Sequence, residues 1–118
     1  MQKLTAKEEE IMHVLWDLKM AFVKDVLAKL PNPKPHYNTV STVIRKMEDK
    51  GFVAHEDFGN TFRYFPIISK EQYRNSFFSH AVNSYFQNSY KNVVSFFAQE
   101  EKISAEELRE IIKLIEKK

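Results

Sequence analysis

The residues best suited to chemistry are short polar side chains on one side of a helix predicted over residues 38–50. A helix turns by about 100° per residue, which brings four hydrogen-bonding side chains to this side: Asn38, Ser41, Thr42 and Arg45. Arg can bind guanine through two hydrogen bonds, and Ser or Thr can contact bases, methyl groups or phosphates. Within this predicted helix no acidic residue occurs before Glu48, whereas an ordinary solvated face would carry more Glu and Lys. The pattern predicts a helix that enters the major groove of DNA.

Basic residues flank this polar side. Lys46 and Lys50 belong to the same predicted helix, and Arg63 lies in a strand-like run that follows it. Such residues contact phosphates. These contacts set the register and affinity of a complex but carry no sequence information. His36 and Tyr37, at the start of the helix, have groups that can bind the duplex backbone. For Tyr37, packing against the loop prolines is an equal alternative.

The elements that must position these residues follow from capping and breaking signals. A capping box at Thr5 and Glu8 predicts the start of a first helix, and Pro31 ends a second one. The third helix ends at Gly51, the residue type best suited to a left-handed C′ position. Two strand-like runs, GFVAHE and TFRYFPI, are joined by the turn DFGN. This order predicts a mainly α fold with a small β-hairpin, a winged helix-turn-helix over residues 1–68.

The remaining segment, residues 69–118, has the composition of a helical dimerisation region. It carries five of the ten Phe and three of the five Tyr. Two helices of this length cannot enclose a core alone, so the segment either folds back over the first domain or packs against a second copy. We favour the homodimer, because a winged domain buries its own apolar stripes and a symmetric dimer is the commonest oligomer. The residues expected at the dimer contact are Tyr73, Phe77, Tyr85, Phe86, Val93, Phe97, Leu108, Ile111, Ile112 and Ile115.

Composition excludes several classes of function. The formal net charge is only +2, so any basic surface must be local, and the absence of cysteine excludes disulfides and thiolate metal sites. The four histidines lie in different predicted elements, and two glycines cannot build a phosphate-binding loop. The polar start resembles no signal peptide, and no run is long and apolar enough to span a bilayer. We expect a cytoplasmic protein, not an enzyme, without metal or cofactor and without stable membrane insertion. His55 is interpreted as an ordinary strand residue.

Three segments carry a family resemblance: LTAKEEEIMHVLW, NTVSTVIRKMEDKGF and FFAQEEKISAEELREIIKLIEKK. In this order and at these separations they resemble segments of the penicillinase repressor family, which includes the methicillin-resistance repressors. In the second segment the matching positions are Thr39, Thr42, Lys50, Gly51 and Phe52, which adds Thr39 to the expected DNA-binding residues. The resemblance implies a homodimeric repressor that binds an inverted repeat in double-stranded DNA, in the promoter of resistance genes.

The resemblance also implies a protein partner, a membrane-embedded metalloprotease that senses β-lactams and causes cleavage of the repressor. In the family the cut falls between an Asn and a Phe of the dimerisation helix, which corresponds to the bond between Phe96 and Phe97. Phe96 therefore replaces the Asn of the better-known members. Ser41 stands where they have a longer Arg or Gln, so we expect a different operator sequence.

One alternative from another class of function remains open. A winged helix can serve as a protein-interaction module that never meets DNA, and the modest net charge of +2 is the observation in its favour. A gel shift with the DNA upstream of the protein's own gene, at moderate salt, distinguishes the two hypotheses.

Overall fold

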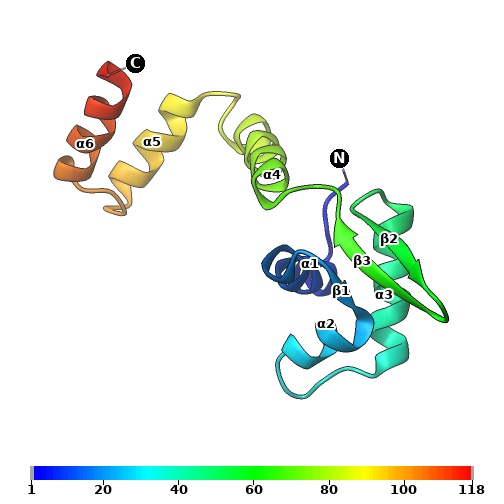
Figure 1. The fold of residues 1–118 in the computed structure, drawn as a ribbon. Helices are drawn as coiled ribbons and strands as arrows, with labels where there is room; N and C mark the ends of the chain where they lie inside the picture. Colours follow the sequence, from blue (N-terminus) through cyan, green and yellow to red (C-terminus); the bar gives the residue numbers. More distant parts are fainter. Residues whose placement is uncertain (1, 118) are drawn as a thin grey trace. The chain divides into compact units, whose positions relative to one another are not determined.

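The computed structural model describes residues 2–117, in which six helices and three strands follow one another (Figure 1). They are α1 (Ala6–Leu18), β1 (Ala21–Phe22), α2 (Val23–Lys29), α3 (Tyr37–Asp49), β2 (Val53–Phe58), β3 (Thr61–Pro66), α4 (Lys70–Tyr85), α5 (Tyr90–Gln99) and α6 (Ala105–Glu116). The mainly α class and the predicted winged helix-turn-helix are confirmed. The sequence pattern misses β1, because two residues are too few to show a period of two.

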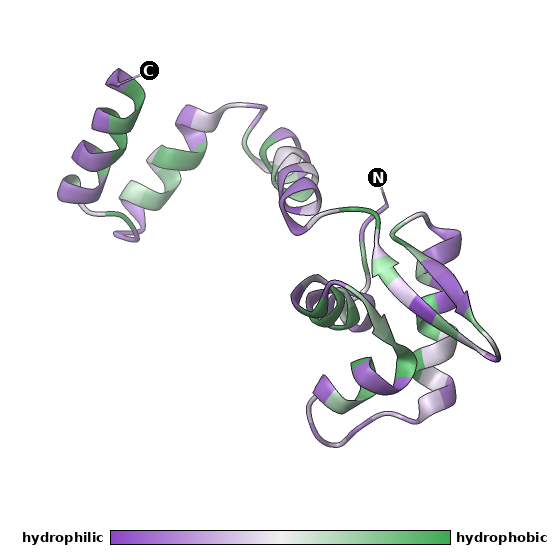
Figure 2. Ribbon diagram, viewed as in Figure 1, coloured by the Kyte–Doolittle hydropathy of each residue, from purple (hydrophilic) through white to green (hydrophobic). Residues whose placement is uncertain are grey.

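Side-chain caps start the helices of the winged domain. The hydroxyl oxygen of Thr5 accepts a hydrogen bond from the Glu8 backbone N–H at 3.2 Å, and the Glu8 carboxylate accepts one from the Thr5 N–H at 2.9 Å. This is the predicted capping box. The start of α3 is capped by His36, whose Nδ1 accepts from the Asn38 N–H at 3.2 Å. Along α1 and α6, hydrophobic and hydrophilic segments alternate as helical spacing requires (Figure 2).

The sheet is antiparallel with the strand order β1-β3-β2. β1 pairs Ala21 with Tyr64 of β3, and β2 and β3 form the hairpin of residues 53–66, which we call the wing. Its turn contains Gly59 with a φ of 62°, a conformation in which glycine lacks the steric penalty of other residues. The short β1 therefore anchors one edge of the wing to the chain between α1 and α2.

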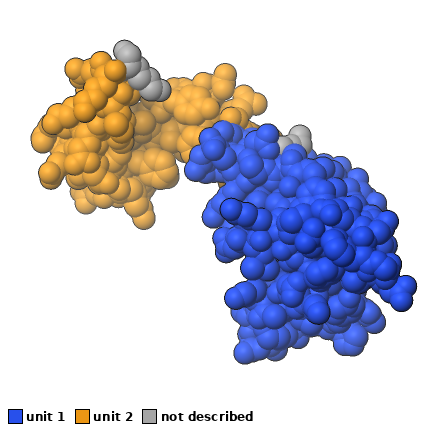
Figure 3. Space-filling view, in the orientation of Figure 1, with its two compact units in different colours: residues 1–76 blue, residues 77–118 orange. Residues whose placement is uncertain are grey.

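The chain divides into two compact units, residues 1–76 and 77–118 (Figure 3). The division falls inside α4, whereas the sequence places it after residue 68. The core of the first unit is built from α1, α2, α3 and the wing. Its fully buried side chains are Ile11, Met12, Leu15, Val26, Val40, Ile44, Met47, Phe52, Val53 and Tyr64.

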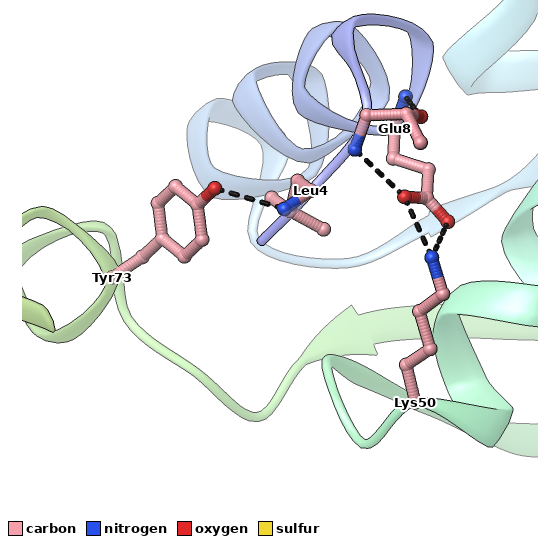
Figure 4. Close-up of polar contacts among 5 residues, drawn as sticks. Leu4, Glu8, Lys50 and Tyr73 are labelled. Carbon is pink, nitrogen blue, oxygen red and sulfur yellow. Dashed lines mark hydrogen bonds and ion pairs between the residues drawn. The ribbon is translucent and has the colours of Figure 1, made fainter. Parts of the chain in front are cut away.

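The first turn of α4 belongs to the first unit through Tyr73. The ring is only 8% exposed, and its centroid lies 6.0 Å from that of Phe52 and 6.1 Å from that of Trp16. Its hydroxyl oxygen accepts a hydrogen bond from the backbone N–H of Leu4 at 3.0 Å (Figure 4). The indole N–H of Trp16 also donates to the carbonyl of Ile68 at 2.8 Å. Tyr73, which the sequence suggests for the dimer contact, is thus a core residue of the first unit.

The second unit buries few side chains. Val82 and Val93 are buried, Phe86 and Leu108 are half-buried, and no side chain of Ala105–Glu116 is buried. We call the following exposed side chains the apolar surface of the second unit: Phe77, Phe78, Tyr85, Tyr90, Val94, Phe96, Phe97, Ile111, Ile112, Leu114 and Ile115. A capping box at Ser104 starts α6, with both hydrogen bonds at 3.0 Å. Within residues 2–117 no helix has the length and apolar character needed to cross a membrane.

Candidate nucleic-acid interface

Helix α3 buries one side and exposes the other. Val40, Ile44 and Met47 are at most 1% exposed and hold the helix against the core of the first unit. Between residues 38 and 46 the exposed polar residues are Asn38, Thr39, Thr42, Arg45 and Lys46, with Ser41 half-buried beside them. We call these six residues the polar side of α3. The structure therefore brings together the predicted base-contacting residues on one accessible surface.

A hydrogen bond within α3 orients Thr42. Its hydroxyl donates to the backbone carbonyl of Asn38 at 2.8 Å. This bond consumes the hydroxyl proton, so the oxygen lone pair and the methyl group remain for an outside partner. Thr42 can therefore accept a hydrogen bond from a base or contact a thymine methyl group, but it cannot donate without losing the internal bond.

Arg45 lies beside the base of the wing. Tyr64 of β3 is 2% exposed, and its pKa is raised, first by burial and then by the negative charge of Glu48. The positive charge of Arg45 and its hydrogen bond to the Tyr64 hydroxyl act in the opposite direction. Arg45 itself is exposed. One guanidinium can therefore touch both the protein and a ligand on the polar side of α3.

Arg63 has partners inside the wing. Its guanidinium lies 3.4 Å from a carboxylate oxygen of Glu56 and 4.6 Å above the ring centroid of Phe58. Its Nε is buried without a hydrogen-bond partner. The side chain is about one-third exposed, so the terminal nitrogens still reach solvent. Arg63 is available to a phosphate, although Glu56 competes for it.

Lys50 is held by a carboxylate that the sequence assigns only to capping. Its ammonium donates to both oxygens of Glu8, at 2.9 and 3.0 Å, joining the end of α3 to the start of α1 (Figure 4). Burial raises the pKa of the Glu8 carboxyl, but the Thr5 backbone N–H and Lys50 outweigh it, and the pKa is lowered overall. Of the basic residues proposed to contact phosphate, Lys50 is thus the one with a buried partner within the protein.

A second polar link joins α3 to the wing and was missed by the sequence reasoning. Nδ1 of His55 lies 2.6 Å from a carboxylate oxygen of Glu48, and its Nε2 lies 3.6 Å from Asp57. The imidazole stacks on Phe62 with a centroid distance of 4.2 Å. The only sequence signal is that Glu48 and His55 flank a tight turn at Gly51. Within residues 2–117 no group of three His, Cys, Asp or Glu residues could hold a metal ion.

Comparisons with known proteins show the family of this chain. The family model described as penicillinase repressor matches residues 4–117. The methicillin resistance regulatory protein MecI of Staphylococcus aureus is 20% identical over 117 residues, which cover 98% of this chain and 95% of that protein. The penicillinase repressor of Bacillus licheniformis is 24% identical over 119 residues, with coverage of 97% and 90%.

Among solved structures, an organohalide-sensing transcriptional regulator in a 2,4-dichlorophenol-bound form is similar. The TM-score is 0.49 at 17% identity, over 98% of this chain and 62% of that one. The identification rests instead on the family model, which covers nearly the whole chain and includes both compact units. The chain belongs to the penicillinase repressor family of winged-helix transcriptional repressors, which are not enzymes.

Proposed function

We propose that this protein is a homodimeric repressor that binds an inverted-repeat operator through α3 and the wing. The observation that carries the proposal is the polar side of α3, exposed opposite the buried Val40, Ile44 and Met47. Asn38, near the N-terminal end of the helix, lies where recognition helices contact base edges. Arg45 reads guanine by two hydrogen bonds, while Ser41, Thr42 and Asn38 read the neighbouring bases.

Phosphate contacts supply most of the affinity in this proposal. Lys46 and Arg63 neutralise phosphates on either side of the groove, and Thr39 adds a hydroxyl contact. We assign Lys50 mainly to the stability of the fold, because Glu8 already holds its ammonium. Binding should therefore weaken as salt rises, and the plot of log K against log salt should fall with a slope of about 0.9 for each phosphate neutralised.

The apolar surface of the second unit supports dimerisation. Ile111, Ile112 and Ile115 are between 43% and 64% exposed, although they lie on one face of α6 at the spacing of a helix that packs against a partner. Large contiguous apolar surfaces on soluble proteins mark contact sites. A second copy covers this surface in the proposal, and two linked winged domains bind an inverted repeat more tightly through their high effective concentration.

The apolar surface of the second unit also contains the bond at which proteolysis would relieve repression. The names of the relatives, a methicillin resistance regulatory protein and a penicillinase repressor, support β-lactam-resistance-type genes as the target. We propose that a membrane metalloprotease sensor cuts the repressor between Phe96 and Phe97 of α5, whose side chains are 44% and 41% exposed. The cut separates α6 from the rest of the chain. The dimer then dissociates, and each winged domain loses the advantage of a linked partner.

A gel shift tests DNA binding. The full chain is titrated into labelled DNA from upstream of its own gene at moderate salt, with random DNA as competitor. We expect a specific complex at lower protein concentration than with random DNA, and sedimentation should give a dimer. Absence of any complex at low salt would instead favour the protein-interaction module.

Cleavage is tested separately. Co-expression with a metalloprotease gene from the same genomic neighbourhood should yield a fragment that ends at Phe96. The Phe96→Asn variant, which restores the residue of the better-known members, should be cleaved faster. An intact chain in both cases would exclude this form of regulation without affecting the operator proposal.

A further inference from the structure

The imidazole of His55 bridges two elements that the proposed function uses together. Glu48 comes from α3 and Asp57 from β2, and both of their carboxylates face the ring of His55. The ring also stacks on Phe62 and lies 5.7 Å from the ring of Tyr64, both in β3. The side chains of His55 and Glu48 are 30% and 29% exposed, so protons have access to the pair while protein covers most of it.

The geometry points to a positioning role: we propose that His55 holds the wing against α3, and that the protonated ring does so more strongly than the neutral one. The proposal rests on the proposed DNA-binding function. A neutral imidazole donates one hydrogen bond, which the 2.6 Å contact assigns to Glu48, and its other nitrogen then faces Asp57 with a lone pair. A protonated ring carries a positive charge within ion-pair distance of both carboxylates, at 2.6 Å from Glu48 and 3.6 Å from Asp57. The groups around the ring are then Glu48, Asp57 and the ring of Tyr64, whose hydroxyl group has Arg45 as its hydrogen-bond partner.

The covalent connection between α3 and the wing is short but does not fix the wing by itself. Only residues 50–52 separate α3 from β2, and Gly51 within them adopts a positive φ of 86°. The pairing of β3 with β1 and the buried side chains Val53 and Tyr64 hold the wing on the first unit. Side-chain contacts across this turn also set its direction relative to α3, and the contact of Glu48 with His55 is one of them. Protonation also adds one positive charge beside the polar side of α3, which favours a polyanion.

The chain offers a matched control in α1. His13 lies 3.8 Å from Glu9, and the side chains are 47% and 46% exposed, but both residues belong to one helix. His13→Gln therefore removes an imidazole and a carboxylate contact without unlinking two elements. His55→Gln removes the same groups from the link between α3 and the wing. Glu48→Gln keeps the imidazole and removes only the charge of its partner.

The first measurement uses the free protein and does not depend on DNA. Amide hydrogen exchange of the wing, corrected for the intrinsic rate at each pH, should rise about tenfold in His55→Gln, as expected when a charge-assisted hydrogen bond is lost. Amides of α1 in the same protein should be unchanged. In His13→Gln the wing should exchange as in the wild type. Wing exchange in His55→Gln equal to that of the wild type would overturn the proposal.

The second measurement is operator affinity from pH 6 to pH 8 at constant ionic strength. The wild type should bind the operator more tightly at pH 6 than at pH 8. In His55→Gln the ratio of these two affinities should be about fivefold smaller. Glu48→Gln should lose part of this pH dependence and His13→Gln none. Footprinting should show that His55→Gln loses protection under the wing but keeps protection under α3. A pH profile and a footprint of His55→Gln equal to those of the wild type would refute the positioning role. If the wild type binds no DNA, the proposed function is refuted, and the hydrogen-exchange measurement alone decides on the role of His55.

Discussion

Replacing Lys50 by Met should destabilise the winged domain, because it leaves the Glu8 carboxylate buried without its cation. Glu8 is 4% exposed, and both of its oxygens accept hydrogen bonds from the ammonium of Lys50. Removing one partner of a buried ion pair costs about 3–5 kcal/mol. Here the carboxylate keeps the Thr5 N–H, and the Lys50 side chain is 29% exposed, so solvent reaches the pair. We therefore expect a loss of about 2–3 kcal/mol.

Urea unfolding followed by circular dichroism measures this loss, with Lys46→Met as the control. Lys46 is an exposed lysine of the same helix, and its loss should change the free energy of unfolding by no more than about 0.5 kcal/mol. The double variant Glu8→Gln with Lys50→Met should recover much of the stability, because no buried charge remains unpaired. If Lys50→Met and Lys46→Met have equal free energies of unfolding, the pair contributes nothing and the reasoning is wrong.

The pH dependence provides a second check on the same pair. The folded-state pKa of Glu8 lies below its ordinary value of 4.5, so near this pH the unfolded chain binds more protons and stability rises with pH. The contribution of Glu8 is therefore complete above the ordinary value and is lost as the pH falls through the lower, folded-state pKa. In Lys50→Met the pKa of Glu8 should rise, because burial is no longer opposed by the lysine. The loss of unfolding free energy in Lys50→Met, relative to the wild type, should become smaller at acidic pH, because Glu8 is neutral there.

Three further outcomes are expected. Arg45→Ala should weaken specific operator binding by about 1–3 kcal/mol in a gel shift, and an equal loss on random DNA would make Arg45 a phosphate contact instead. Ile112→Asp should shift the protein from dimer to monomer in sedimentation, because a charge cannot be buried in an apolar contact, and a persistent dimer would place the contact elsewhere. Tyr73→Phe should lower the free energy of unfolding by about 0.5–1.5 kcal/mol through loss of the Leu4 hydrogen bond, whereas an unchanged value would mean that water replaces the hydroxyl.

The local features of this protein are readable along the chain. The capping box at Thr5 is predicted from two residues three positions apart, a spacing that Ser104 and Glu107 share, and the polar side of α3 is predicted from helical spacing. Gly51 and Gly59 mark the end of α3 and the turn of the wing, because both positions have a positive φ. In each case the interacting groups lie within one or two turns of backbone, so residue types and spacing are sufficient to identify them.

The partners of Lys50 and Tyr73 were decided only by tertiary structure. Lys50 meets Glu8 across 42 positions, and Tyr73 meets Leu4 across 69. An exposed lysine suits a phosphate as well as a carboxylate, and an amphipathic tyrosine suits a dimer contact as well as a core. Residue type alone therefore does not distinguish between these kinds of contact. Packing of α1 against the end of α3 and the start of α4 brings one partner within bonding distance, and that arrangement depends on the whole core rather than on any local pattern.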